Sequence, residues 1–281
     1  MIQNMRDLGG LLTKDNRIIR SGMLIRSANL AHASRRDLDG ISTVIDLRTP
    51  GERREAPDKT HRREYLPLPI LDSSTAGISH EAETDGSGFP DMTKLYPMLV
   101  ENCTAAFRNV LLAIMQHDFT DGAILWHCSE GKDRCGLTTA LVLEALGIDR
   151  DAILVDYLKT NEVNRSKAIR LHDQVIATHG QAYAESMYRV YIADERYLQA
   201  AWEAMGENYL TEKLKIRKKR LPPSARPYWK AVSERVTKDF TVFLGRIAVI
   251  PSAAAYAPSL PGKSSRVPFR NLIKNYESTF I

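Results

Sequence analysis

Apolar residues gather in four short runs in the first half of the chain. The runs at 23–28, 42–48 and 122–128 are rich in β-branched or large apolar residues, and a weaker run lies at 64–68. Short runs of this kind, bounded by turn residues, are typical of β-strands. We therefore expect four strands here.

Helical spacing dominates between and after these runs. Residues 93–117 carry apolar side chains three or four positions apart, and Cys103 falls on this pattern, which predicts a long helix with a buried core thiol. Gly147 is expected to end a later helix and Asp149 to cap the next. Those later helices are predicted over 136–146, 149–159, 162–178 and 194–206. Strands alternating with helices predict an α/β fold, with a central, mostly parallel β-sheet of about four to five strands flanked by helices.

Composition narrows the class of protein. The 281 residues are 43% hydrophobic and 26% charged, which predicts a folded globular protein. No stretch approaches the ~20 apolar residues of a membrane span, and the first residues lack the apolar segment of a cleavable signal. The three cysteines show neither a disulfide framework nor metal-site spacing. We expect a cytoplasmic protein, or one exported without a cleavable signal peptide, that needs no metal or cofactor.

Charge is spread unevenly along the chain. The net charge is +5, yet residues 207–281 alone hold 15 Lys and Arg against 5 Asp and Glu. This change predicts a folded domain over 1–214 and a basic, Pro/Ala/Ser-rich tail over 215–281. A solvated appendage is the favoured interpretation of the tail. The alternative is a patch that contacts acidic lipid or nucleic acid.

The stretch HCSEGKDRCG, residues 127–136, carries the clearest chemistry. The predicted strand ends at His127 and the predicted helix begins near Gly136. In open α/β sheets, ligands bind beyond the carboxyl ends of the strands, where a helix N-terminus attracts anions. Gly131 and Gly136 let the backbone approach an oxyanion closely.

Two side chains in this loop suit a phosphoryl group. Arg134 offers a planar fork that binds two oxygens at once. Cys128 lies beside Arg134, Lys132 and the expected helix N-terminus, all of which favour its thiolate. The loop is therefore expected to hold a tetrahedral anion against a nucleophilic sulfur.

The same stretch resembles the His-Cys-x5-Arg signature of the cysteine-dependent protein tyrosine phosphatases. Its Gly-Lys-Asp-Arg sequence is similar to that of the bacterial branch of the family, which overlaps with the dual-specificity and phosphoinositide phosphatases. The resemblance covers about 4–214 and is supported by the stretches at 4–10, 24–30, 44–53 and 151–161. Two residues depart from the family pattern: Met5 replaces an aromatic residue, and Cys135 replaces Thr or Ser.

The resemblance implies a two-step reaction. Cys128 attacks phosphorus to form a phosphocysteine, which water then hydrolyses. Arg134 and the loop backbone bind the phosphate oxygens. The residues expected to bind phosphate are Ser129, Glu130, Gly131, Lys132, Asp133 and Arg134. Supporting positions are His127, Cys135 and Gly136, with His127 orienting the loop and stabilising the thiolate.

Two aspartates are candidates for the general acid. Asp133 lies inside the loop, where its alternative part is to pair with a neighbouring cation. Asp72 lies in the long connection over 69–92, of a length common for lids and binding loops. Lys132 resembles a lysine that phosphoinositide phosphatases use for a further phosphate.

The expected activity is therefore hydrolysis of phosphate monoesters, on phosphotyrosine, phosphoserine or phosphothreonine, or on phosphoinositides. Partners would be phosphorylated proteins or phosphoinositides, and the oligomeric state stays open. Two alternatives remain: a phosphate-binding module impaired by Cys135, and a cysteine enzyme of the rhodanese or arsenate-reductase kind.

Three arginines stay outside this assignment. Arg6 and Asp7, before two glycines, predict a tight turn held by a local ion pair. Arg26 and Arg48 follow predicted strands, and their direction relative to the pocket is left open.

Overall fold

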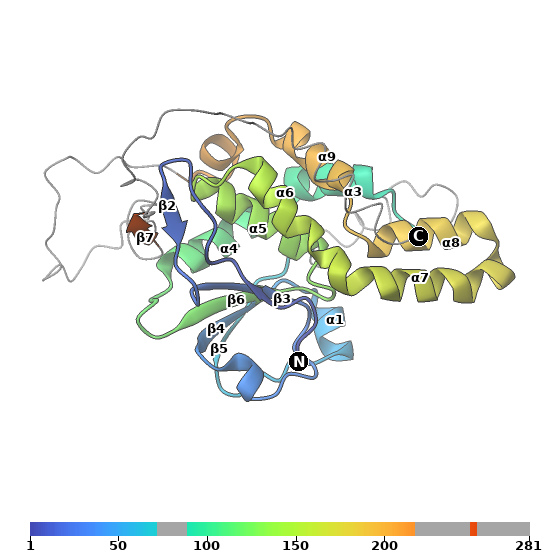
Figure 1. Cartoon of the computed structure of the whole chain (residues 1–281), viewed down its shortest axis with the longest axis horizontal. Coiled ribbons are helices and arrows are strands. Elements are labelled where there is room, and N and C mark those ends of the chain that lie inside the picture. Colours follow the sequence, from blue (N-terminus) through green and yellow to red (C-terminus); the bar gives the residue numbers. More distant parts are fainter. Residues whose placement is uncertain (72–88, 217–247, 252–281) are drawn as a thin grey trace, which may run out of the picture. The chain divides into compact units, whose positions relative to one another are not determined.

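The computed structural model describes residues 1–71, 89–216 and 248–251. A five-stranded sheet in the order β1-β3-β6-β4-β5 lies at its centre (Figure 1). The strands are β1 (Arg6–Asp7), β3 (Leu24–Ser27), β4 (Ile41–Asp46), β5 (Glu64–Pro67) and β6 (Ala123–His127). All neighbours pair in parallel except β1, which is antiparallel to β3. The predicted α/β fold is confirmed, and β1 is a strand that the apolar pattern did not predict.

The register of the sheet places the ends of three strands together. Ser27 of β3 and Asp46 of β4 both pair with His127 of β6. All five residues of β6 are buried. The predicted loop at 128–132 therefore begins at the carboxyl edge of the central strand.

Apart from α1, which the sequence pattern did not predict, the helices follow the predicted positions with two exceptions. The helices are α1 (Pro50–Glu55), α3 (Met92–Asn102), α4 (Thr104–Gln116), α5 (Asp133–Ala145), α6 (Arg150–Leu158), α7 (Thr160–His179), α8 (Gln181–Tyr191) and α9 (Glu195–Met205). Asp149 caps α6 as predicted, through a hydrogen bond to the N–H of Asp151. Gly147, with φ of 81°, follows the end of α5 as expected.

The single helix predicted over 93–117 is wrong. Two helices, α3 and α4, meet at Cys103 with a bend of 71°. The apolar face changes partner at this point, since α3 packs on α9 whereas α4 packs on α5. Cys103 itself is 3% exposed, so the predicted buried thiol is confirmed.

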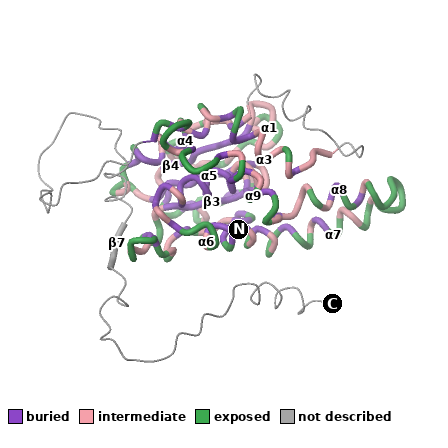
Figure 2. The backbone as a smooth tube through the Cα atoms, turned by 90° about the horizontal axis from the view of Figure 1, so that it is seen from above, coloured by how far each residue is buried: buried purple, intermediate pink, exposed green. Residues whose placement is uncertain are grey.

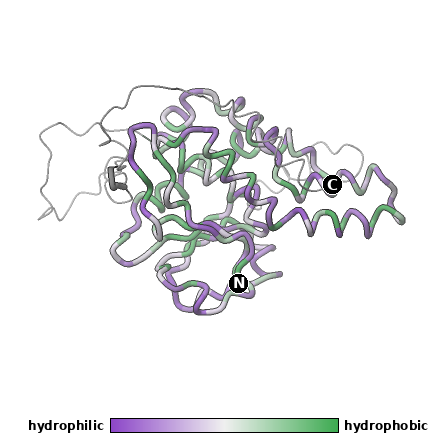
Figure 3. Tube along the Cα trace, in the orientation of Figure 1, coloured by the Kyte–Doolittle hydropathy of each residue, from purple (hydrophilic) through white to green (hydrophobic). Residues whose placement is uncertain are grey.

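The second exception is α8, which the sequence pattern did not predict. Gly180, with φ of 82°, separates it from α7, and the two helices lie side by side as a hairpin (Figure 1). Polar and apolar residues alternate along both helices (Figure 3). The outer end of the hairpin is exposed, whereas α5 and β3 are largely buried (Figure 2).

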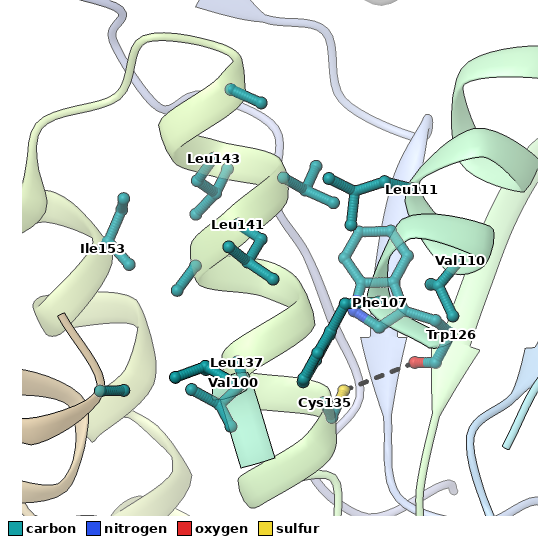
Figure 4. Packing of buried hydrophobic residues seen from close by; sticks show 14 of the residues in the cluster. Val100, Phe107, Val110, Leu111, Trp126, Cys135, Leu137, Leu141, Leu143 and Ile153 are labelled. Atoms are coloured by element: carbon teal, nitrogen blue, oxygen red, sulfur yellow. Dashed lines mark hydrogen bonds between the residues drawn. The ribbon is translucent and has the colours of Figure 1, made fainter. Parts of the chain in front are cut away.

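The main core lies between the sheet and α4, α5 and α9. Trp126 of β6 is fully buried and donates a hydrogen bond of 3.1 Å from Nε1 to Oγ1 of Thr139. Phe107 and Val110 of α4 pack near it, and Leu137 of α5 belongs to the same cluster (Figure 4). This packing fixes the strand that leads into the loop.

A short strand from the predicted tail returns to the folded domain. β7 (Ala248–Pro251) pairs antiparallel with β2 (Arg17–Ile19), and residues 1–251 form one compact unit. Most of the tail, 217–247 and 252–281, lies outside the described residues, so its contact with lipid or nucleic acid stays a prediction. Within the described ranges no single helix is long and apolar enough to cross a membrane. Only α3 and α4 taken together, as a bent pair, have the length and apolar composition of a membrane span.

Candidate active site

The loop between β6 and α5 forms the floor of the site. Cys128, the first residue after β6, is 3% exposed. α5 begins at Asp133, earlier than the predicted start near Gly136. The helix N-terminus therefore lies inside the loop, and its positive dipole end faces the anion that the loop is predicted to hold.

The carbonyl groups of this loop are bound on its outer side. The carbonyl of Ser129 accepts hydrogen bonds from the backbone and side chain of Asn29, at 3.2 and 3.0 Å. The carbonyl of Gly131 accepts from Asn4 at 2.9 Å and from Arg26 at 2.7 Å. With the carbonyls directed outward, the N–H groups are left for the inner side, where they suit phosphate oxygens.

Both predicted glycines are required by close contacts. Gly131 has φ of +68°, and a Cβ there would lie 2.6 Å from the carbonyl oxygen of Ser27. A Cβ on Gly136 would lie 2.9 Å from the ring of Tyr157 in α6. These contacts let the loop pack on β3 and let α5 pack on α6.

Glu52 of α1 holds the guanidinium of Arg134. The two side chains form a bidentate pair with both N–O distances at 2.6 Å, and Glu52 also accepts a hydrogen bond from Ser129. Burial alone would raise the pKa of Glu52, but the hydrogen bonds and charge of Arg134, with help from Ser129 and Thr49, lower it to about 2. An arginine carries five N–H donors, so this pair leaves donors for a phosphate.

Glu52 is a functional residue that the sequence analysis missed. The only sequence signal at Glu52 is its position three residues after Thr49, a spacing typical of a capping box. The two residues do form a capping box at the start of α1. The cap fixes α1, and α1 in turn places the carboxylate against Arg134. A capping pattern predicts the helix but not this second contact.

Lys132 points away from the loop's inner side. Its ammonium donates to the backbone carbonyls of Val190 and Ile192, the latter at 3.0 Å, and lies 3.1 Å from the carboxylate of Asp133. The residue is 1% exposed. The loop is thereby tied to the C-terminal end of α8.

Asp133 has two donors on one carboxylate oxygen. Tyr96 donates to Oδ1 at 2.7 Å, and the ammonium of Lys132 lies 3.1 Å from the same atom. Burial first, and the Asp133 carboxylate second, raise the pKa of Tyr96 well above its usual value, so its hydroxyl keeps its proton. The Asp133 side chain is 28% exposed and remains accessible. Asp72, the other predicted acid, lies outside the described residues.

His127 is buried in a cluster of charged groups beneath the loop. Its Nδ1 lies 3.2 Å from the carbonyl oxygen of Cys128, and its Nε2 lies 3.0 Å from Oδ2 of Asp58 without hydrogen-bond alignment. Arg48 forms ion pairs with Asp46 and Asp58 at 2.8 and 2.7 Å. Asp46, Asp58 and His127 are close enough to surround a metal ion. Because the Arg48 guanidinium already lies between the two carboxylates, the cluster fits an internal ion network that orients His127.

The predicted local ion pair between Arg6 and Asp7 is wrong. Arg6 reaches α6 and forms an ion pair of 2.8 Å with Asp156. Asp7 accepts hydrogen bonds from the backbone N–H groups of Gly9 and Gly22, at 2.9 and 2.7 Å. Both residues therefore stabilise contacts between segments, which short-range spacing could not show.

Cys135 is fully buried behind the loop. Its Sγ donates toward the carbonyl oxygen of Trp126 at 3.6 Å (Figure 4). Burial raises the pKa of this thiol to about 11. The second cysteine of the loop is therefore a core thiol that bonds to the strand carrying the nucleophile.

Comparison with known proteins agrees with this geometry. A family model described as "Tyrosine phosphatase family" matches residues 1–221. A Cupriavidus necator protein, provisionally named a tyrosine-protein phosphatase, is 30% identical over 76% of this chain and 82% of its own length. The "Triple specificity protein phosphatase PtpB" of Mycobacterium tuberculosis is 32% identical over 57% of this chain and 67% of its own length. A "Tyrosine-protein phosphatase" of Nostoc commune is 28% identical over 47% and 46%.

The chain belongs to the tyrosine phosphatase family. It is thus an enzyme of the cysteine-dependent phosphatase class, which acts on phosphorylated substrates through a phosphocysteine formed on the enzyme. The assignment of Cys128 as nucleophile and of Arg134 as the phosphate-binding arginine stays a prediction from the signature.

Proposed function

We propose that this protein hydrolyses phosphotyrosine side chains of proteins. The observation that carries the proposal is the position of Lys132, whose ammonium is engaged by two backbone carbonyls and by Asp133. A lysine held in this way does not offer a site for a second phosphate. The arrangement therefore favours a substrate with one phosphate over a polyphosphorylated lipid head group.

The depth of the nucleophile supports the same substrate class. Cys128 is 3% exposed, and this burial favours an extended phosphate ester as the group that reaches its sulfur. A phosphorylated phenol holds its phosphorus farther from the peptide backbone than phosphoserine does. The inner N–H groups and Arg134 then bind the three terminal oxygens during in-line attack.

Asp133 is our proposed general acid. It is accessible beside the loop, and Tyr96 fixes one of its oxygens at 2.7 Å. In the first step the acid gives its proton to the phenolic oxygen as the P–O bond breaks. In the second step the resulting carboxylate accepts a proton from the attacking water.

A comparison of three substrates tests the proposed function. Initial rates would be measured on a phosphotyrosine peptide, on the same peptide with phosphoserine, and on vesicles containing a phosphoinositide. We expect kcat/KM for phosphotyrosine to exceed the other two by at least about tenfold, with Cys128→Ser inactive on all three. Faster turnover of the phosphoinositide, lost in Lys132→Met, would overturn the proposal.

The general acid is tested by leaving-group dependence. Asp133→Asn should slow a phenyl phosphate with a poor leaving group by about 10²-fold or more, and p-nitrophenyl phosphate much less. The same variant should flatten the limb of the pH profile that falls as pH rises. If Asp72→Asn shows these effects and Asp133→Asn does not, the acid lies in the 69–92 connection.

A further inference from the structure

Two arginines and one aspartate form a buried cluster directly beneath the phosphate loop. Arg26 of β3 is fully buried and donates to Asp156 of α6 at 2.9 Å and to the carbonyl of Gly131 at 2.7 Å. Arg6 of β1 binds the same carboxylate at 2.8 Å. The cluster thus joins β1, β3 and α6 to the loop.

This cluster carries an excess positive charge. Two guanidinium groups share one carboxylate, and the side chains of Arg6, Arg26 and Asp156 are 15%, 0% and 5% exposed. The Nε atom of Arg26 is buried with no hydrogen-bond partner among the described residues. A buried cation without a matching anion is costly, so an anion close to Arg26 would be strongly stabilised.

The other cations around the loop already have acidic partners. Charged or titratable groups around Cys128 come from β1, β3, α1, β6, α5 and α6. They are Arg6, Arg26, Glu52, Asp58, His127, Lys132, Asp133, Arg134, Cys135 and Asp156, together with Asp46 and Arg48 at the end of β4. Arg134 pairs with Glu52, Lys132 lies against Asp133, and Arg48 lies between Asp46 and Asp58. Among these described groups, only the cluster of Arg26 sets two guanidinium groups against one carboxylate.

Two sulfur atoms are candidates for the missing anion. Burial disfavours the charge of Arg26, whereas Asp156 and the anionic form of either Cys135 or Cys128 favour it. Cys135 remains a neutral thiol, since burial raises its pKa to about 11 and its proton is directed to the Trp126 carbonyl. Arg26 pairs with Trp126 in the sheet, so its side chain lies on the same face as that of Cys128, two positions after Trp126.

We propose that Arg26 is a positioning residue that stabilises the thiolate of Cys128. In the second step, a water oxygen bonds to phosphorus while the S–P bond breaks and its electron pair returns to sulfur. The water proton passes to the carboxylate of the general acid. Arg26 stabilises the sulfur anion that this step releases, and Asp156 limits how much positive charge the cluster presents.

The first experiment measures Cys128 directly. Alkylation by iodoacetamide would be followed against pH, with the modified Cys128 peptide quantified by mass spectrometry. Arg26→Gln should move the midpoint upward by about one pH unit, because it removes a buried cation. Asp156→Asn should move it downward, because it removes the anion that offsets Arg26, and Arg26→Lys should keep it near the wild-type value.

The opposite directions of the two midpoint shifts distinguish an electrostatic effect on Cys128 from a structural one. A purely structural cluster would give upward shifts, or loss of reactivity, in both Arg26→Gln and Asp156→Asn, and that result would overturn the proposal. An unchanged midpoint in Arg26→Gln would also overturn it. If thermal melting shows that Arg26→Gln does not fold, the downward shift in Asp156→Asn decides the matter, and its absence rejects the proposal.

A kinetic experiment tests the second step. With p-nitrophenyl phosphate, Arg26→Gln should lower kcat about tenfold and leave a larger burst of p-nitrophenol, since phosphocysteine accumulates. A fall in kcat with no increase in burst amplitude would contradict the assignment. Because neither readout uses a phosphotyrosine peptide, the inference rests on the phosphocysteine chemistry alone and stands apart from the proposed substrate preference.

Discussion

Arg134 and Lys132 lie two positions apart in the phosphate loop, and their side chains have opposite surroundings. Arg134 forms a bidentate pair with Glu52, whose side chain is 30% exposed, on the side of α1. Lys132 is 1% exposed and directs its ammonium to the C-terminal end of α8. Arg134 therefore keeps N–H donors for a ligand, whereas the ammonium of Lys132 is already hydrogen-bonded within the protein.

The difference shows that charge in a binding loop is not sufficient evidence of ligand contact. A planar guanidinium can form a carboxylate pair on one edge and still bind phosphate on another. An ammonium has three donors at a single point, and here backbone carbonyls and Asp133 surround that point. The neighbouring helices α1 and α8 therefore decide what each cation does.

The largest effect is expected from Arg134→Lys. The substitution keeps the charge but loses the fork that binds both phosphate and Glu52, so kcat should fall about 10³-fold with an unchanged fold. Turnover of p-nitrophenyl phosphate and circular dichroism would be measured together. Activity within tenfold of wild type would show that point charge alone suffices, and that the two cations differ less than their surroundings indicate.

Glu52→Gln should have the next largest effect on activity. The amide lacks the charge that holds the guanidinium, so Arg134 loses its fixed orientation, and kcat should fall roughly 30-fold. Glu55→Gln, on the same short helix and exposed, is the matched control and should leave kcat unchanged. Equal effects of the two substitutions would mean that α1 as a whole, not the Glu52 carboxylate, supports the loop.

The same carboxylate makes stability depend on pH. Because its pKa falls from 4.5 in the unfolded chain to about 2 in the fold, Glu52 stabilises the protein above about pH 5 and loses this contribution as pH falls toward 2. Allowing for its partial exposure, the contribution is about 2 kcal/mol. Urea unfolding of wild type and Glu52→Gln should show a difference in free energy at pH 6 that closes toward pH 2. If the difference in unfolding free energy stayed constant from pH 6 to pH 2, the ion pair of Glu52 with Arg134 would not be the source of this stabilisation.

Lys132→Met should have the smallest effect, and on stability rather than on chemistry. Removing the ammonium leaves the carbonyls of Val190 and Ile192 without this donor, which should cost about 1 kcal/mol in the free energy of unfolding. The kcat for p-nitrophenyl phosphate should stay within about threefold of wild type. Lys14→Met, at a side chain 67% exposed, serves as the surface control. A loss of activity as large as that of Glu52→Gln would place Lys132 among the phosphate-binding groups.

Local sequence patterns were sufficient to predict four of the five strands of the central sheet, and the loop. The four apolar runs correspond to β3, β4, β5 and β6, and the polar stretch after β6 marks where the anion site lies. These signals are short-range, because a buried strand and a helix N-terminus follow from adjacent residues. The glycine at 131 was likewise predictable from its part in a tight loop.

Contacts between distant segments were not predictable from the sequence. The pairing of Glu52 with Arg134, and of Arg6 and Arg26 with Asp156, depends on which elements the sheet brings together. The break at Cys103 likewise reflects a change of packing partner rather than a local breaker. Spacing along one chain carries no information on such contacts.

The central position of β6 has a consequence for the order of folding. Leu24 and Val44 pair with Ile124 and Leu125, about 80 to 100 positions later in the chain. During synthesis β3 and β4 emerge well before the strand that lies between them, so each then has an unpaired edge open to wrong partners. The nucleophile follows directly on β6, and the enzyme cannot gain activity before this sheet is complete. The rate at which activity recovers during refolding would therefore report the formation of these non-local strand pairs, the slowest step of folding.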